Sequence, residues 1–126
     1  MHHSRLCSLI IDCHANDLGD AARFWSQALG RPIKAGTDPA LEKYVGLVTH
    51  ADEPVIELQK VEHPSRVHLD IESDDIEAEV RCLEALGARK IEAIRTWVVM
   101  EAPTGHRFCV VRPQRGGMGA HGNQWA

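Results

Sequence analysis

A degenerate internal repeat is the feature that most constrains how this 126-residue chain can fold. Each copy starts with a short run that contains leucine, isoleucine and aspartate, at residues 9–12 and again at 68–71. An amphipathic stretch follows in both copies and ends in Ala-Leu-Gly, at residues 28–30 and 85–87. Such self-similarity indicates one supersecondary unit that occurs twice. We therefore expect two copies of the same module.

Hydrophobic periodicity predicts one helix in each copy. Apolar residues recur at three- and four-residue steps over residues 18–29 and again over 76–86, so each stretch presents one apolar stripe. Short polar side chains that cap helix N-termini stand before both stretches. Asp17 is expected to cap the first helix, and Asp74 or Asp75 the second.

Alternating and β-branched runs predict four strands in each copy. These runs lie at residues 5–13, 31–35, 43–49, 54–60, 66–73, 89–94, 96–102 and 107–112. With the helices, the order is β-α-β-β-β twice, which places the chain in the α+β class.

The expected domain covers residues 4–113 and is followed by a tail. Module one spans about 4–62 and module two about 66–113, with a linker around Pro64. Residues 114–126 are rich in glycine, which predicts a flexible C-terminal tail. Trp125 could anchor this tail on another surface.

Charge and composition exclude several classes of protein. The formal net charge is −4 and the pI is near 6.0, so we expect no nucleic acid partner. The apolar run at residues 6–11 is too short for a signal peptide or a membrane span. The cysteines form no CxxC pair, which favours reduced thiols in the cytoplasm, with disulfides as the alternative.

An ordered set of segments between residues 5 and 113 resembles a known superfamily. The segments are Leu-Ile-Ile-Asp-Cys at 9–13, Ala-Arg-Phe-Trp at 22–25, Ala-Leu-Gly-Arg at 28–31, Val-Ile-Glu-Leu-Gln at 55–59, Val-His-Leu-Asp at 67–70, Trp-Val-Val-Met at 97–100 and Ala-Pro-Thr-Gly-His-Arg-Phe-Cys at 102–109. In this combination they resemble the glyoxalase/bleomycin-resistance/dioxygenase superfamily, also called vicinal oxygen chelate proteins. Within it, the set is similar to a glyoxalase-like subgroup.

The resemblance implies a particular architecture and a particular kind of site. Each module would form a curved four-stranded sheet, and the two modules would make one domain around a central cleft. Metal-dependent members carry a His, Glu or Gln ligand on the first and the last strand of each module. Substrate oxygens occupy the open metal positions, and the metal acts as a Lewis acid. Because members commonly form homodimers, we expect a homodimer here.

Two residues match these ligand positions. Glu57 lies on the last strand of module one, where Ile56 and Leu58 are expected to face the helix. Glu57 and Gln59 then face the cleft, the first as metal ligand and catalytic base, the second as a substrate-binding group. His68, on the first strand of module two, is the other expected metal ligand. A solvated strand carboxylate and an ordinary polar sheet histidine are the alternatives.

The other two ligand positions depart from the pattern. Residues 8–10 hold no His, Glu or Gln, and the last strand of module two carries Cys109. A Cys109 thiolate could ligate a soft metal, with a small buried cysteine as the alternative. A third ligand could come from Cys109, Asp70 or a partner chain. Trp97 could line the cleft and bind a planar substrate, with core packing as the alternative.

Two functions agree with this pattern. The first is a cytoplasmic enzyme that uses one divalent metal (Zn, Ni, Fe or Mn) for lyase, isomerase or dioxygenase chemistry on an unidentified small molecule. The second is a metal-free small-molecule binding protein, similar to the drug-binding resistance members. Its cleft would take planar or cationic ligands.

Overall fold

A computed structural model describes all residues of the chain, from Met1 to Ala126. The chain divides into two compact units, each built around one copy of the repeat. The first unit is Ser8–Val67, and the second combines Met1–Cys7 with His68–Ala126. The N-terminal residues therefore belong with the second copy, although the first copy follows them directly in sequence.

The unit of the first repeat contains three paired strands and one long helix. Its elements are residues 8–14 of β1 (His2–His14), α1 (Gly19–Leu29), the short 3₁₀ helix η1 (Pro39–Leu41), β2 (Tyr44–Leu47) and β3 (Val55–Val61). Strand β3 pairs antiparallel with β2 and parallel with residues 8–14 of β1. The strand expected at residues 31–35 is only an isolated bridge between Ile33 and Leu47, because Pro32 lacks the N–H that a longer ladder requires.

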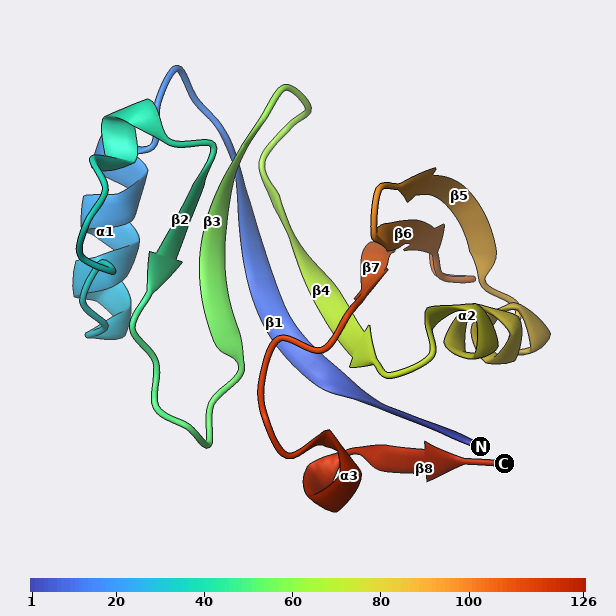
Figure 1. Cartoon of the computed structure of the whole chain (residues 1–126). Helices are drawn as coiled ribbons and strands as arrows, with labels where there is room; N and C mark the ends of the chain where they lie inside the picture. Colours follow the sequence, from blue (N-terminus) through green and yellow to red (C-terminus); the bar gives the residue numbers. More distant parts are fainter. The chain divides into compact units, whose positions relative to one another are not determined.

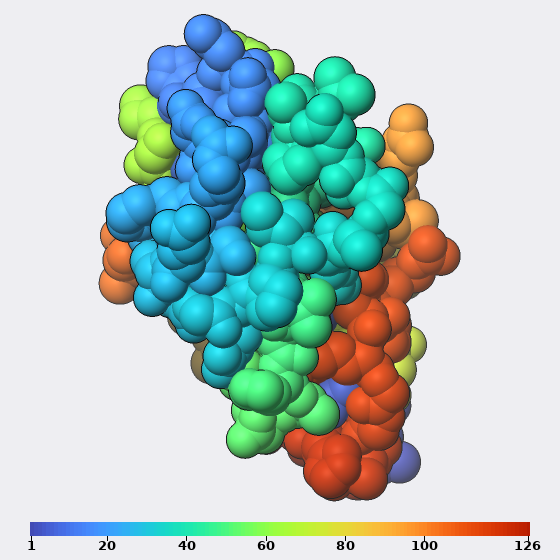
Figure 2. All heavy atoms as spheres, turned by 90° about the vertical axis from the view of Figure 1, so that its left-hand side faces the viewer, coloured from blue at the N-terminus to red at the C-terminus, as the bar shows by residue number.

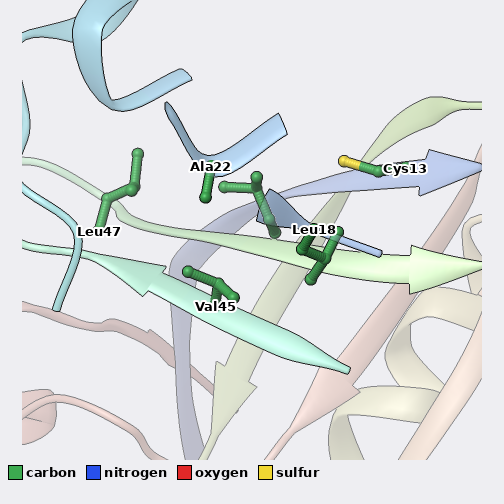
Figure 3. Close-up of a cluster of buried hydrophobic side chains, with 6 residues drawn as sticks. Cys13, Leu18, Ala22, Val45 and Leu47 are labelled. Atoms are coloured by element: carbon green, nitrogen blue, oxygen red, sulfur yellow. The ribbon is translucent and has the colours of Figure 1, made fainter. Parts of the chain in front are cut away.

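Helix α1 packs on one face of these strands, as Figure 1 shows. The buried core beneath it is formed by Cys13, Leu18, Ala22, Val45, Leu47 and Leu58, five of which are labelled in Figure 3. Ile56 also packs against this core, so alternate residues of β3 face the other way. Figure 2 shows the segment after α1, which carries η1, beside the helix on the surface.

The helix boundaries of the first unit agree with the sequence, but the cap differs in detail. Helix α1 follows Leu18, and its C-cap Gly30 adopts the left-handed conformation with φ of 65°. Asp17 lies one residue before the N-cap, Leu18. Its carboxylate accepts a hydrogen bond from the Gly19 backbone N–H at 2.8 Å.

The second unit follows the order of the first, with a full strand at Arg89–Ile94 where the first unit has only the bridge at Ile33. It contains β4 (Arg66–Ser73), whose first two residues lie in the other unit, α2 (Ile76–Ala85), β5 (Arg89–Ile94), β6 (Trp97–Glu101) and β7 (Arg107–Val111). Strands β5, β6 and β7 pair antiparallel, and β7 pairs parallel with β4. In both units the first strand of the repeat thus lies parallel to the last. The α+β class with two βαβββ modules is confirmed, with the second strand of module one reduced to a bridge.

Helix α2 covers one face of the strands of the second unit. Val80 of the helix forms a buried cluster with Val98, Met100 and Val110 of the strands. The carboxylate of Asp75 caps the helix by accepting a hydrogen bond from the Ala78 backbone N–H at 3.0 Å. Because side chains alternate along a strand, the residues between the core positions lie on the opposite face of the sheet.

The glycine-rich C-terminal segment, expected as a tail, carries two short regular elements. It forms the short helix α3 (Met118–His121) and strand β8 (Asn123–Trp125), which pairs antiparallel with His2–Ser4 of β1. The Trp125 indole N–H donates to the Ser4 hydroxyl at 2.8 Å. Figure 1 shows the chain ends side by side. Glycine content could not reveal this pairing, which joins residues more than a hundred positions apart.

None of the helices in the structure is both long enough and apolar enough to cross a lipid bilayer.

Candidate functional site

Three potential metal ligands lie close together on the strands of the second unit, on the face that points away from α2. His68 and Asp70 are two residues apart on β4 and therefore share a face. The parallel pairing of β4 with β7 places Cys109 directly opposite Asp70. The donor atoms of the three side chains all lie within 4.8 Å of one another. We call His68, Asp70 and Cys109 the three-donor cluster.

The three-donor cluster is shielded from solvent, and its carboxylate lacks a hydrogen bond at one oxygen. The side chains of His68 and Asp70 are only 12% and 16% exposed. His68 Nε2 lies 3.4 Å from Asp70 Oδ1, which is too long and misdirected for a hydrogen bond, and this buried oxygen has no other hydrogen-bond partner. A buried carboxylate oxygen of this kind is normally compensated by a donor or by a cation.

The neighbouring strand supplies an apolar and aromatic border to this cluster. Val99 of β6 lies opposite Cys109. Trp97 stands two residues earlier, on the same face as Val99 and away from the buried Val98 and Met100. Trp97 is half-buried, and it is not among the residues that pack in the core cluster of this unit.

Strand β6 ends at a charged residue, Glu101. Glu101 accepts hydrogen bonds from the guanidinium groups of Arg89 and Arg107, both at 3.0 Å. These bonds hold the pKa of Glu101 below its ordinary value. Glu101 is thus an ionised partner of two arginines rather than an acid or base poised for proton transfer.

Glu57 and Gln59 belong to the first unit and face away from α1, as the alternation predicts. Glu57 lies between Ile10 of β1 and Gly46 of β2 and is half-buried. The side-chain amide of Gln59 donates to the Tyr44 hydroxyl at 3.2 Å. The structure describes where these side chains lie, and their functional roles stay predictions.

Asp12 is a polar residue that the sequence interpretation did not single out. It lies on β1 opposite Gln59, and only 2% of it is exposed. The signal was present, because an aspartate within the apolar run Leu-Ile-Ile-Asp-Cys interrupts a strand that is otherwise built for burial. The neighbouring Cys13 packs in the core. Burial, and to a lesser extent the negative charge of Asp12, raises the pKa of the Cys13 thiol, so this thiol is unreactive.

Family comparison agrees with this architecture. Residues 8–111 match the family described as glyoxalase-like domain. The chain belongs to the glyoxalase-like domain family. This family is part of the glyoxalase/bleomycin-resistance/dioxygenase superfamily, which the sequence resemblance predicted. No curated protein matches the chain.

Solved structures share the glyoxalase-like fold at low sequence identity. Methylmalonyl-CoA epimerase from Mycobacterium tuberculosis is 15% identical, with a TM-score of 0.64 over 87% of this chain and 88% of that one. A hypothetical protein from Bacillus halodurans C-125 is 14% identical, with a TM-score of 0.63 over 90% and 97%. A glyoxalase/bleomycin resistance protein/dioxygenase superfamily member from Vibrio splendidus 12B01 is 20% identical, with a TM-score of 0.52 over 85% and 99%.

Superfamily membership gives the three-donor cluster its context. Members bind small molecules, often assemble as oligomers and often hold a divalent metal. Imidazole, carboxylate and thiolate are all recognised ligands of such metals. The glyoxalase-like chain therefore carries, within its second unit alone, a donor set that could hold one.

Proposed function

We propose that this glyoxalase-like protein is a metal-dependent enzyme that performs lyase or isomerase chemistry on a small molecule with adjacent oxygens. The observation that carries the proposal is the three-donor cluster, in which a buried Asp70 oxygen without a hydrogen bond lies beside His68 and Cys109. Dioxygenase chemistry on a catechol belongs to the same proposal, because it would use the same chelating arrangement.

The donor set favours a borderline or soft divalent metal. A thiolate with an imidazole nitrogen suits zinc and excludes magnesium and calcium, which prefer oxygen ligands alone. Among the metals expected from the sequence, zinc fits best, and iron and nickel remain compatible. Three protein ligands leave a position open for substrate, as in other catalytic zinc sites. When bound there, the metal would supply Lewis-acid polarisation of a substrate oxygen.

The remaining expected residues would bind the substrate and move a proton. Trp97 offers a half-buried ring beside the cluster for a planar part of the substrate. Gln59 donates its amide N–H to Tyr44, which leaves its carbonyl oxygen to accept from a ligand hydroxyl. Glu57 keeps the role that the family resemblance implies, a base that removes a proton from a carbon next to a carbonyl. The same resemblance implies that Glu57 is a metal ligand, and the Glu57→Gln variant below separates the two roles.

Metal content tests the proposal directly. The protein would be purified without an affinity tag and without chelator, and metals would be quantified per chain by mass spectrometry. We expect near-stoichiometric zinc or another transition metal, which His68→Ala removes. His106→Ala is the matched control, because His106 is exposed at a turn and hydrogen-bonds only locally, to Thr104. A metal-free protein that gains no thermal stability from added zinc would overturn the proposal.

Substrate screening follows from the metal result. Hemithioacetals of α-keto aldehydes, catechols and methylmalonyl-CoA represent the three reaction types. Turnover that depends on the metal and is lost in Glu57→Gln, with metal content unchanged, would support Glu57 as the base. Loss of the metal in the same variant would instead make Glu57 a ligand.

A metal-free small-molecule binding protein is the second candidate function. It is favoured by residues 8–10, which offer no His, Glu or Gln where metal-dependent members have a ligand. In that case Trp97 and Val99 would form part of the wall of a site for planar or cationic ligands. Ligand binding that survives His68→Ala but is lost in Trp97→Ala would identify this function.

Assembly and location complete the proposal. We propose a homodimer, because superfamily members often oligomerise. We also propose the cytoplasmic location that the spacing of the cysteines favours. Light scattering coupled to size exclusion would give the mass. A mass of one chain, 14.0 kDa, across the working concentration range would contradict the dimer.

A further inference from the structure

Arg107 of β7 lies next to the three-donor cluster, on the same face of the strands. It stands two residues before Cys109, and side chains two apart on a strand point to the same side. The parallel register pairs Leu69 of β4 with Phe108, so one step back along both strands places Arg107 beside His68. Because neighbouring strands lie about 4.8 Å apart, a side chain as long as arginine reaches a molecule bound at the cluster.

A carboxylate on the next strand holds the Arg107 guanidinium without using all of its donors. Glu101 of β6 is directly opposite Arg107 in the register, and its Oε2 accepts from Arg107 Nε at 3.0 Å. Glu101 Oε1 accepts from Arg89 of β5 at 3.0 Å. The bond to Nε leaves both terminal Nη groups of Arg107 to donate to a ligand. The Arg107 side chain is 35% exposed, so a ligand has access to these groups.

The charges on this face favour an anion. Arg89, Arg107 and Glu101 together carry one net positive charge, in a chain whose formal net charge is −4. The charge of a divalent metal at the cluster would be balanced by Asp70 and a Cys109 thiolate, so the positive charge at Arg107 would remain for the substrate. A neutral ligand would displace water from the guanidinium without replacing its hydrogen bonds, which costs free energy.

We propose that the substrate of this face is a carboxylate. Its chelating oxygens would meet the three-donor cluster. Its carboxylate, joined to them through a short carbon spacer, would accept an end-on pair of hydrogen bonds from the Nη groups of Arg107. This inference rests on the proposed function in taking the cluster as the substrate site. Arg107 itself is not one of the three donors, so its selectivity can be measured with and without metal.

Two probes that differ in one charge test this assignment on the full chain. 3,4-Dihydroxybenzoate carries adjacent hydroxyl groups and a carboxylate, and 3,4-dihydroxybenzamide replaces that carboxylate by a neutral amide of nearly the same shape. Their dissociation constants would be measured by calorimetry and ligand-observed NMR on zinc-loaded and on metal-free protein. We expect the acid to bind at least about tenfold more tightly than the amide. Equal binding of the two probes, or no binding of either, would overturn the proposal.

Three variants locate the selectivity. Arg107→Gln should remove it, so that acid and amide bind within about twofold of each other. Arg107→Lys keeps the charge without the planar pair of donors, should retain part of the preference, and serves if Arg107→Gln impairs folding. Arg89→Gln is the matched control, because it also removes one charge and one hydrogen bond to Glu101 but lies on β5, two strands beyond β7. A preference that survives Arg107→Gln, or that Arg89→Gln removes equally, would overturn the assignment.

Metal content, measured on the same samples, separates this inference from the proposed enzyme. A metal-free protein that prefers the acid and loses this preference in Arg107→Gln would support the carboxylate site and contradict the metal proposal. A metal-loaded protein that binds acid and amide equally would contradict the carboxylate site and leave the metal proposal standing.

Discussion

Glu72 provides the sharpest test of how the second unit is held together. Its side chain on β4 is completely buried, and its two carboxylate oxygens accept separate pairs of hydrogen bonds. Oε1 accepts from the backbone N–H groups of Gln114 and Arg115 at 2.8 and 3.2 Å. Oε2 accepts from the Nε atoms of Arg5 and Arg115 at 2.9 and 3.3 Å. The carboxylate thus joins β4 to β1 and to the C-terminal segment.

Glu72→Gln removes half of these bonds and the charge. The amide oxygen can still accept from the two backbone groups, but the amide nitrogen replaces the acceptor for both guanidinium groups. A hydrogen bond to a charged group contributes about 1.5–3 kcal/mol, and breaking a buried pair costs about 3–5 kcal/mol. The side chains of Arg5 and Arg115 are 13% and 25% exposed, so water compensates in part. We expect about 3 kcal/mol lower stability.

The effect of Glu72→Gln on stability should depend on pH, and the pKa of Glu72 determines in which direction. Burial acts to raise the pKa of Glu72, but the hydrogen bonds from Gln114, Arg115 and Arg5 outweigh it and hold the pKa below the ordinary value. A carboxyl whose folded pKa is lowered stabilises the protein fully above its unfolded pKa of about 4.3. This stabilisation is lost as the pH falls towards the folded pKa. The difference between wild type and Glu72→Gln should therefore narrow on acidification.

Urea unfolding of the full chain at pH 7 and at about pH 3.5 measures both effects. At pH 7 the expected loss corresponds to a melting temperature lower by roughly 10 °C for a domain of this size. Glu84→Gln is the matched control, because Glu84 is exposed on α2 and should change stability by less than about 0.5 kcal/mol. A loss below about 1 kcal/mol at pH 7, or one that is the same at both pH values, would refute the ionic role.

Three further predictions concern the metal site, the core and the C-terminal strand. Cys109→Ser should weaken zinc binding at least about tenfold in a competitive chelator titration. It should also abolish the thiolate-to-metal absorption of the cobalt-substituted protein, and unchanged spectra would exclude Cys109 as a ligand. Leu58→Ala should lower the free energy of unfolding by about 3 kcal/mol in urea, because Leu58 is fully buried, and a loss under about 1 kcal/mol would contradict its place in the core. Trp125→Ala should accelerate amide exchange in residues 2–4 and 123–125 but not around Leu58, whereas equal exchange in wild type and variant would show that the indole does not hold β8.

Local patterns predicted most of the elements because helix and strand periodicity reflect one-sided burial. The helices expected at residues 18–29 and 76–86 correspond to Gly19–Leu29 and Ile76–Ala85. The strand at 66–73 has the bounds Arg66–Ser73. The expected and the observed elements differ where the backbone or a contact between distant residues outweighs the local pattern. Pro32 reduced one expected strand to a bridge, and a strand pair with the N-terminus lies in the glycine-rich segment, where no strand was expected.

The candidate site was only partly predictable. His68 was identified from its strand position, and Asp70 and Cys109 were named as alternatives for a third ligand. Their meeting depends on the parallel pairing of β4 with β7, whose paired residues are 39 positions apart. No local pattern gives the register of such a pair, and a shift by one residue would turn Cys109 to the helix side. Asp12 was missed because its burial depends on neighbours from β3 and from residues 65–67.

The sequence by itself determined the repeat, the element order and which side of each strand is apolar. These properties are local, since they follow from the spacing of side chains along one helix or one strand. Only the tertiary structure decided which polar residues become neighbours, that Asp70 is buried beside His68 and Cys109, and that both chain ends share a strand pair. Those outcomes depend on register and on contacts between distant segments, because donor geometry and burial exist only after the sheets have formed.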